Sequence, residues 1–141
     1  YVDNQDKFNL TQNQLLIDSK RYYLPVKGIV TDGFDVERNH FAIDVSVDIG
    51  TPVKAILAGT VLFSEWSVET GHVILLDHGE SLISVYKHNS KTLKSQNDTV
   101  QAGEVIAFSG EEGTLSSGPH LHFEIWKNGL PIDPETILSF E

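Results

Sequence analysis

Short apolar runs separated by glycine constrain the fold of this 141-residue chain more than any other feature. The runs are rich in Val, Ile and Leu, recur about every ten residues, and in several cases alternate apolar with polar positions. They are GIVTDGF, FAIDVSVDIG, TPVKAILAGTVLF, GHVILLDHG, SLISVYKH, DTVQAGEVIAFSG and HLHFEIW. No long amphipathic helix is evident between them. The pattern predicts an all-β domain, either a sandwich or a barrel.

The two ends of the chain differ from this β-rich middle. Residues 1–24 include a polar stretch, QDKFNLTQNQ, with little periodicity, and we interpret them as an N-terminal appendage to a domain spanning residues 25–141. Near the other end, Asp133 as N-cap and Pro134 at the first helical position predict a short C-terminal helix. The chain begins at Tyr1 and contains no methionine. We therefore expect a processed product or excised domain, with any membrane anchor or regulatory segment lying outside it.

Composition excludes several kinds of partner and site. The formal charge is −10, from 20 acidic and 10 basic residues, so the surface repels phosphate backbones and nucleic-acid binding is not expected. Cysteine is absent, which removes thiolate metal sites, disulfides and cysteine nucleophiles. Any metal must therefore be held by His, Asp or Glu. No apolar run approaches the roughly 18 residues that a membrane-spanning helix needs.

The segment GPHLHFEIW carries the most specific candidate chemistry. Strand alternation puts His120, His122 and Glu124 on one side, with the two imidazoles roughly 7 Å apart at Cα. One ring can bind a metal while its neighbour reaches a bound water or a substrate oxygen. Glu124 is then either a base or, as we expect, an orienting partner for a histidine.

The segment NHFAIDV adds His40 and Asp44. Its β-branched residues and the flanking glycine and proline disfavour a helix. On an ideal strand the two residues would lie about 13 Å apart. The chain must therefore bend between them if both bind one ion.

The remaining histidines are less specific. In SVYKHNS, alternation places Tyr86 and His88 on one strand face. His72 and His78 flank the strand VILLD, and we interpret them as turn or strand-end residues that make local hydrogen bonds.

Taken in order, five blocks of the chain resemble the lysostaphin/LytM-type zinc metallopeptidases, which cut peptide cross-links in bacterial peptidoglycan. The blocks are His40-x-x-x-Asp44, GTPVKAILAGTV, YKH, VQAGEVIAFSG and SSGPHLHFEIWKNGLPIDP, and the resemblance runs from about Lys27 to Pro134. It implies a compact antiparallel β-sheet domain, sandwich-like and of the duplicated hybrid motif type, with a substrate groove. A short similarity between TPVKAILAGTV and DTVQAGEVIAFSG is consistent with two related β units.

By position, the resemblance makes His40, Asp44 and His122 the ligands of one zinc ion, and His88 and His120 the catalytic histidines. Three protein ligands leave a fourth position open for a water molecule, whose pKa zinc lowers toward about 7. The two catalytic histidines would position that water, move its proton and stabilise the oxyanion. The resemblance thus implies a zinc metalloendopeptidase that acts on stem or cross-bridge peptides of peptidoglycan, in the periplasm or cell envelope.

Two other functions stay open at this point. The main alternative is a non-catalytic LytM-like regulator that binds and activates another cell-wall hydrolase, although all five site positions are occupied here. A sugar phosphotransfer protein on a similar β scaffold would use paired histidines without a metal. Ala42 stands where the family commonly has glycine, and the segment before His40 is short, which favours a more open groove.

Overall fold

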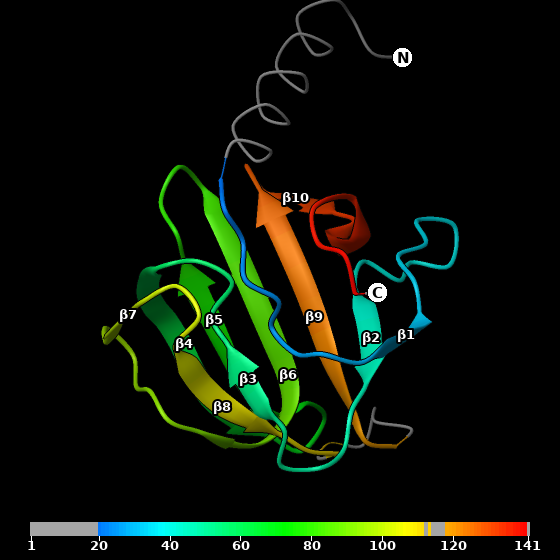
Figure 1. Ribbon diagram of the computed structural model, residues 1–141, viewed down its shortest axis with the longest axis horizontal. Coiled ribbons are helices and arrows are strands. Elements are labelled where there is room, and N and C mark those ends of the chain that lie inside the picture. Colours follow the sequence, from blue (N-terminus) through cyan, green and yellow to red (C-terminus); the bar gives the residue numbers. More distant parts are fainter. Residues whose placement is uncertain (1–19, 112, 114–117, 141) are drawn as a thin grey trace, which may run out of the picture.

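The computed structural model describes residues 20–111, 113 and 118–140, and the chain there is almost entirely β-structure (Figure 1). The elements are β1 (Ile29–Asp32), β2 (Ile43–Ser46), β3 (Pro52–Lys54), β4 (Gly59–Ser67), β5 (Gly71–Asp77), β6 (Leu82–Thr92), β7 (Thr99–Val100), β8 (Val105–Ser109), β9 (His120–Lys127), β10 (Leu130–Ile132) and the 3₁₀ turn η1 (Pro134–Thr136). The predicted all-β antiparallel fold is confirmed. No helix in these described ranges is long and apolar enough to cross a membrane.

The main sheet runs in the order β1-β2-β9-β6-β5-β4-β7, and each neighbouring pair is antiparallel. The strand β10 pairs with β9, while β8 pairs with both β3 and β6. In Figure 1, β3 and β8 lie in front of the main sheet. The sheet therefore has an inner face, covered by β3 and β8, and an outer face.

The inner face carries the hydrophobic core. Tyr86 and Phe123, the two largest fully buried side chains, pack with their rings tilted at 50° and their centroids 5.2 Å apart. The Tyr86 hydroxyl accepts hydrogen bonds from the Ile56 backbone N–H at 3.2 Å and the Ser84 hydroxyl at 2.9 Å. Because strand side chains alternate, the residues between these core positions on β5, β6 and β9 point to the outer face.

Each predicted strand segment contains a strand, but β10 was not predicted. Asn128 and Gly129 form the two-residue turn between β9 and β10, with φ of 53° and 78°. An Asn-Gly pair with positive φ at both positions is the preferred connection of a tight hairpin. The signal for β10 was therefore present in the sequence.

The predicted C-terminal helix is a single 3₁₀ turn. Asp133 caps it, because its Oδ1 accepts a hydrogen bond from the Glu135 backbone N–H at 3.0 Å, and Pro134 follows at the first helical position. The cap and the proline act as predicted.

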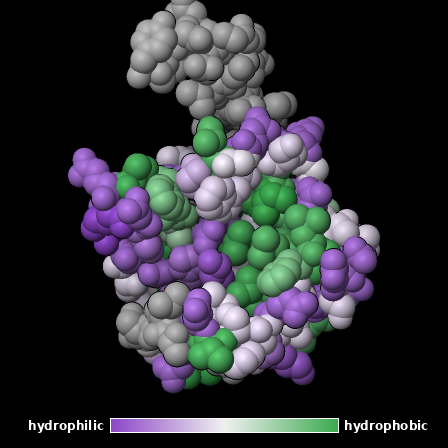
Figure 2. Space-filling view, turned by 180° about the vertical axis from the view of Figure 1, so that it is seen from behind, coloured by the Kyte–Doolittle hydropathy of each residue, from purple (hydrophilic) through white to green (hydrophobic). Residues whose placement is uncertain are grey.

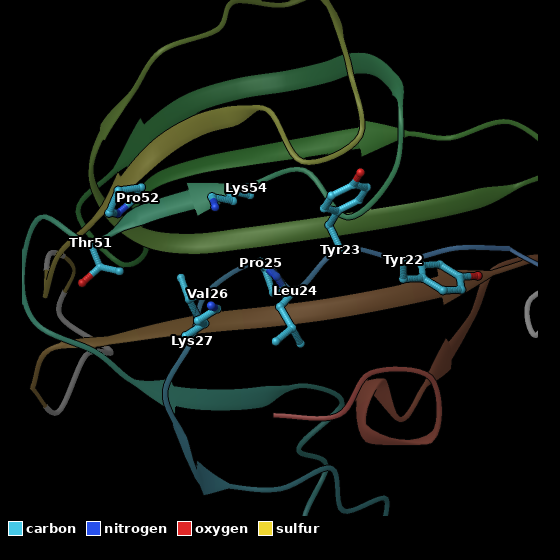
Figure 3. Close-up of a pocket in the computed structure, with 9 residues that line it drawn as sticks. All are labelled: Tyr22, Tyr23, Leu24, Pro25, Val26, Lys27, Thr51, Pro52 and Lys54. Atoms are coloured by element: carbon cyan, nitrogen blue, oxygen red, sulfur yellow. The ribbon is translucent and has the colours of Figure 1, made fainter. Parts of the chain in front are cut away.

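The segment before β1 lies along the domain. Tyr22 and Leu24 pack against the core, and the Tyr23 backbone N–H donates to Ile56 O at 2.9 Å. With Thr51, Pro52 and Lys54 this segment lines a pocket of about 470 Å³ (Figure 3). Residues 1–19 of the predicted appendage lie outside the described residues, and the domain boundary after residue 24 stays a prediction.

Candidate active site

Pairing between β2 and β9 brings an aspartate beside the two histidines of HLHFE. Asp44 is the direct partner of His122 across the two strands, and His120 pairs with Ser46. The Nδ1 of His122 lies 3.2 Å from Asp44 Oδ1, and the Nε2 of His120 lies 3.7 Å from the same oxygen. The predicted common face of the β9 side chains is thereby confirmed for His120 and His122.

His40 reaches the same point from a loop. It lies before β2 and forms an isolated bridge with Asp35, so the chain bends between His40 and Asp44 as the spacing required. The Nδ1 of His40 lies 2.7 Å from Gly33 O, and its Nε2 lies 3.5 Å from Asp44 Oδ2. A hydrogen bond from Nδ1–H to the carbonyl leaves the Nε2 lone pair directed at the site.

The residues fit a metal ion. One potential ligand atom from each of His40, Asp44 and His122 lies within 4.8 Å of the other two. Asp44 Oδ1 is buried and accepts no hydrogen bond of normal geometry. Two imidazoles and a buried carboxylate oxygen that accepts no hydrogen bond form a donor set that zinc prefers in an open site. Burial raises the pKa of Asp44, but the adjacent His122 ring and the charges of His120 and His40 together lower it below its ordinary value.

His88 reaches the site in a way that alternation did not predict. Tyr86 is buried in the core, whereas His88 lies 5.0 Å from His120 and 5.8 Å from His122 between ring centroids. The prediction that Tyr86 and His88 share a face is therefore wrong. His88 has φ of +67°, and the β5–β6 register shifts beside it, which turns its side chain out of the regular alternation.

A left-handed backbone conformation is uncommon for a histidine. Such conformations are costly and cluster at functional sites. The His88 backbone N–H donates to Thr70 O at 2.9 Å, which helps to hold this conformation. His88 is 4% exposed and His120 is 8% exposed, so both rings line the site rather than extending into solvent.

Glu124 holds His122 from the side opposite Asp44. Its Oε2 lies 2.6 Å from His122 Nε2 and 3.1 Å from Lys87 Nζ, and its Oε1 accepts a hydrogen bond from the Trp126 indole N–H at 2.8 Å. Burial raises the pKa of Glu124, but these three partners outweigh it and lower the pKa to about 2. Burial has the opposite effect on His122 and lowers its pKa, but the contacts with Asp44 and Glu124 outweigh burial and raise that pKa. The expected position of Glu124 beside a histidine is confirmed.

Three residues of the site were missed in the sequence analysis. The pocket, of about 360 Å³, is also lined by Asp32, Thr70 and Lys87. Asp32 Oδ2 lies 3.6 Å from His40 Nε2, and its Oδ1 accepts a hydrogen bond from Arg38 at 2.7 Å. Lys87 pairs directly with His122 across β6 and β9. Strand pairing brings Asp32 and Lys87 to the site, and the turn between β4 and β5 brings Thr70. Nothing local in the sequence marks these neighbours.

His72 and His78 lie outside this pocket. The two ring nitrogens of His78 lie 2.9 Å from Ala58 O and 2.7 Å from Ser84 Oγ, and burial lowers its pKa. His72 is the second residue of β5 and pairs with Asn89. His78 forms hydrogen bonds as expected, but its Ala58 partner lies 20 residues away in the chain, so they are not all local.

An antiparallel sheet that gathers two histidines and an aspartate around one point defines a protein with a candidate metal centre on a β scaffold. Comparison with known proteins gives the family. The profile of Peptidase family M23 matches residues 38–134, and the chain belongs to this family.

Curated relatives agree with this assignment. The chain is 43% identical over 101 residues to an uncharacterized metalloprotease of Haemophilus influenzae, covering 71% of this chain and 21% of the relative. It is 36% identical over 100 residues to the DD-carboxypeptidase/endopeptidase Mpg of Neisseria meningitidis, covering 71% of this chain and 23% of the relative. It is 34% identical over 112 residues to outer membrane antigenic lipoprotein B of Haemophilus influenzae, covering 78% of this chain and 27% of the relative. The chain thus spans about a quarter of the length of these relatives.

Solved structures share the fold. A putative peptidase M23 from Pseudomonas aeruginosa matches with a TM-score of 0.78 and 26% identity, over 96% of this chain and 61% of that one. A zinc-containing peptidase from Vibrio cholerae matches with a TM-score of 0.72 and 29% identity, over 82% of this chain and 36% of that one. The catalytic domain of lysostaphin from Staphylococcus simulans matches with a TM-score of 0.64 and 30% identity, over 86% of this chain and 94% of that one. The similarity to lysostaphin predicted from the sequence is confirmed.

Proposed function

We propose that this protein is a zinc-dependent endopeptidase that hydrolyses peptide bonds in bacterial peptidoglycan. The observation that carries the proposal is the convergence of His40, Asp44 and His122 within 4.8 Å, with two further imidazoles beside them. A pure binding module has no need of such a cluster. Membership of a peptidase family and the similarity to a DD-carboxypeptidase/endopeptidase support the reaction class.

The residues of the site divide into two groups. His40, Asp44 and His122 would hold the zinc ion, with His40 oriented by Gly33 O. When bound, zinc supplies a Lewis acid that polarises a carbonyl and activates water. The two imidazoles of His88 and His120 stand beside these ligands, at the place where a reacting peptide would lie.

His120 is suited to move the proton. Its Nδ1 lies 2.7 Å from Gly118 O, and a hydrogen bond donated there leaves Nε2 free of hydrogen and directed at the site. In the hydrolysis, water adds to the peptide carbonyl carbon, His120 Nε2 accepts the released proton, and that proton passes to the amine nitrogen as the C–N bond breaks. His88 would donate a hydrogen bond to the carbonyl oxygen as that oxygen gains negative charge.

The cell envelope is the compartment that such a substrate requires. A relative named as an outer membrane lipoprotein is consistent with this location. We therefore propose that the chain acts outside the cytoplasm, with peptidoglycan stem or cross-bridge peptides as its partners.

The direct test combines a zinc measurement with turnover of purified peptidoglycan. We expect about one zinc ion per chain and release of peptide fragments, which mass spectrometry would identify with defined muropeptides. A chelator should stop the release, and added zinc should restore it. Bound zinc without any released fragment would instead favour a regulator that binds another hydrolase.

Replacing Glu124 with glutamine should weaken zinc binding. The amide keeps the shape of the side chain but loses the charge that holds His122 and pairs with Lys87. Loss of such an outer partner typically costs about 10–100-fold in metal affinity or activity. Competition with a chromogenic chelator would measure the zinc affinity. The matched control is Glu65→Gln, because Glu65 is an exposed residue of β4. Unchanged affinity in Glu124→Gln would show that the carboxylate does not support the ligand.

A further inference from the structure

The outer face of the sheet carries an apolar groove next to the candidate active site. The groove has a volume of about 590 Å³, and its apolar lining comes from Phe63, Val73, Leu75, Ile83, Val85 and Trp126. These residues belong to β4, β5, β6 and β9 and share the outer face with His122 and Lys87. Figure 2 shows apolar side chains gathered in a hollow beside a hydrophilic area.

The groove is separate from the hydrophobic core. Val73 and Val85 are 6% and 4% exposed, yet neither belongs to the core cluster on the inner face. Phe63, at the rim, is 44% exposed. A contiguous apolar surface of this kind is unfavourable in water and commonly marks a binding site.

The groove and the candidate metal site are continuous. Thr70 and Lys87 line both of them, and Glu124 lines the groove while contacting His122. The Trp126 indole forms part of the groove wall, and its N–H donates to Glu124. A peptide that lies across the metal site can therefore extend into the groove.

The chemistry of the groove selects an uncharged side chain. The charges of Lys87 and Glu124, at its polar end, pair with each other at 3.1 Å. A charged or strongly polar side chain placed over the apolar wall would lose water without gaining a partner. An aliphatic side chain would bury apolar area there, which stabilises binding.

We propose that this groove is a substrate subsite for an uncharged aliphatic residue on one side of the peptide bond to be cut. The inference rests on the proposed function, because it assigns the groove to the same peptide. In peptidoglycan, alanine supplies a side chain of this class. The groove is much larger than one methyl group, so a leucine in the same position should bind more tightly than alanine.

Isothermal titration calorimetry with the full chain, freed of metal by a chelator, tests the subsite without catalysis. The probes are acetylated, amidated hexa-alanine peptides in which the third residue is leucine or glutamine. These two side chains are similar in size and both uncharged, so a difference in affinity reports apolar against polar character. We expect the leucine peptide to bind about tenfold more tightly, as the burial of one aliphatic side chain allows.

A pair of neighbouring variants locates the effect. Phe63→Ser should weaken the affinity for the leucine peptide about tenfold and leave the affinity for the glutamine peptide nearly unchanged. Leu62→Ser is the matched control, because Leu62 is 41% exposed on the same strand but does not line the groove. That variant should bind both peptides within about twofold of the unaltered chain. Thermal unfolding would verify that both variants are folded.

Two results would overturn the subsite. One is equal or undetectable binding of the two peptides by the unaltered chain, and the other is an equal effect of Leu62→Ser and Phe63→Ser. Failure of the proposed function has a different signature. In that case the leucine preference persists in the metal-free chain, but purified peptidoglycan is not cut.

Discussion

Replacing His122 with alanine should abolish both zinc retention and peptidoglycan hydrolysis. His122 is the central residue of the site, since Asp44 lies 3.2 Å from one ring nitrogen and Glu124 lies 2.6 Å from the other. Its removal leaves two ligands for the metal and exposes two carboxylates to each other without the intervening imidazole. We expect zinc affinity to fall by more than the roughly 100-fold that loss of an outer partner costs. Zinc content after dialysis and turnover of purified peptidoglycan measure the two losses.

His72→Ala is the matched control for this change. His72 is a partly exposed residue of the same sheet and lies outside the site pocket. It should keep both zinc and activity. Circular dichroism of the metal-free chains would show whether either substitution disturbs the fold. Stoichiometric, tightly held zinc in a folded His122→Ala variant would contradict the proposed ligand set.

Replacing His120 with alanine should separate metal binding from turnover. His120 shares a strand face with His122 but stands outside the group of three ligand atoms that lie within 4.8 Å. Zinc should therefore be retained. Loss of a positioned proton acceptor typically costs about 10²–10⁴-fold in rate, so turnover should nearly disappear. The zinc content and the rate of fragment release from the same preparation provide the measurement.

The contrast between two residues of one motif makes this test sharp. His120 and His122 differ by two positions on β9, so a general disturbance of the strand would affect both variants alike. Our assignment requires zinc loss only for His122→Ala. Near-full activity of His120→Ala would show that the roles are wrong, and loss of zinc in both variants while both stay folded would contradict the placing of His120 outside the ligand set.

Local patterns in the sequence were sufficient wherever neighbours along the chain decide the geometry. Strand alternation predicted the common face of His120, His122 and Glu124, because the side-chain period of two holds within one strand. The N-cap role of Asp133 was equally local. The hairpin at Asn128 was open to the same reasoning and was missed.

The bend between His40 and Asp44 shows the limit of such patterns. The spacing showed that a bend was necessary if both bind one ion, but its form depends on a bridge to Asp35 and a contact with Gly33 O. His88 marks a stronger limit. Regular alternation predicts that it points into the core with Tyr86, and only the left-handed backbone at His88 reverses that direction.

Residue types and strand periods were thus sufficient to indicate an antiparallel β fold, and the resemblance of the ordered motifs to a peptidase family named the five residues of the candidate centre. The three-dimensional arrangement decided which strands meet. It placed Asp44 opposite His122, set Lys87 beside Glu124, and joined an apolar groove to the candidate centre. The physical reason is that register between distant strands depends on the packing of the whole sheet, whereas alternation depends only on the backbone of one strand.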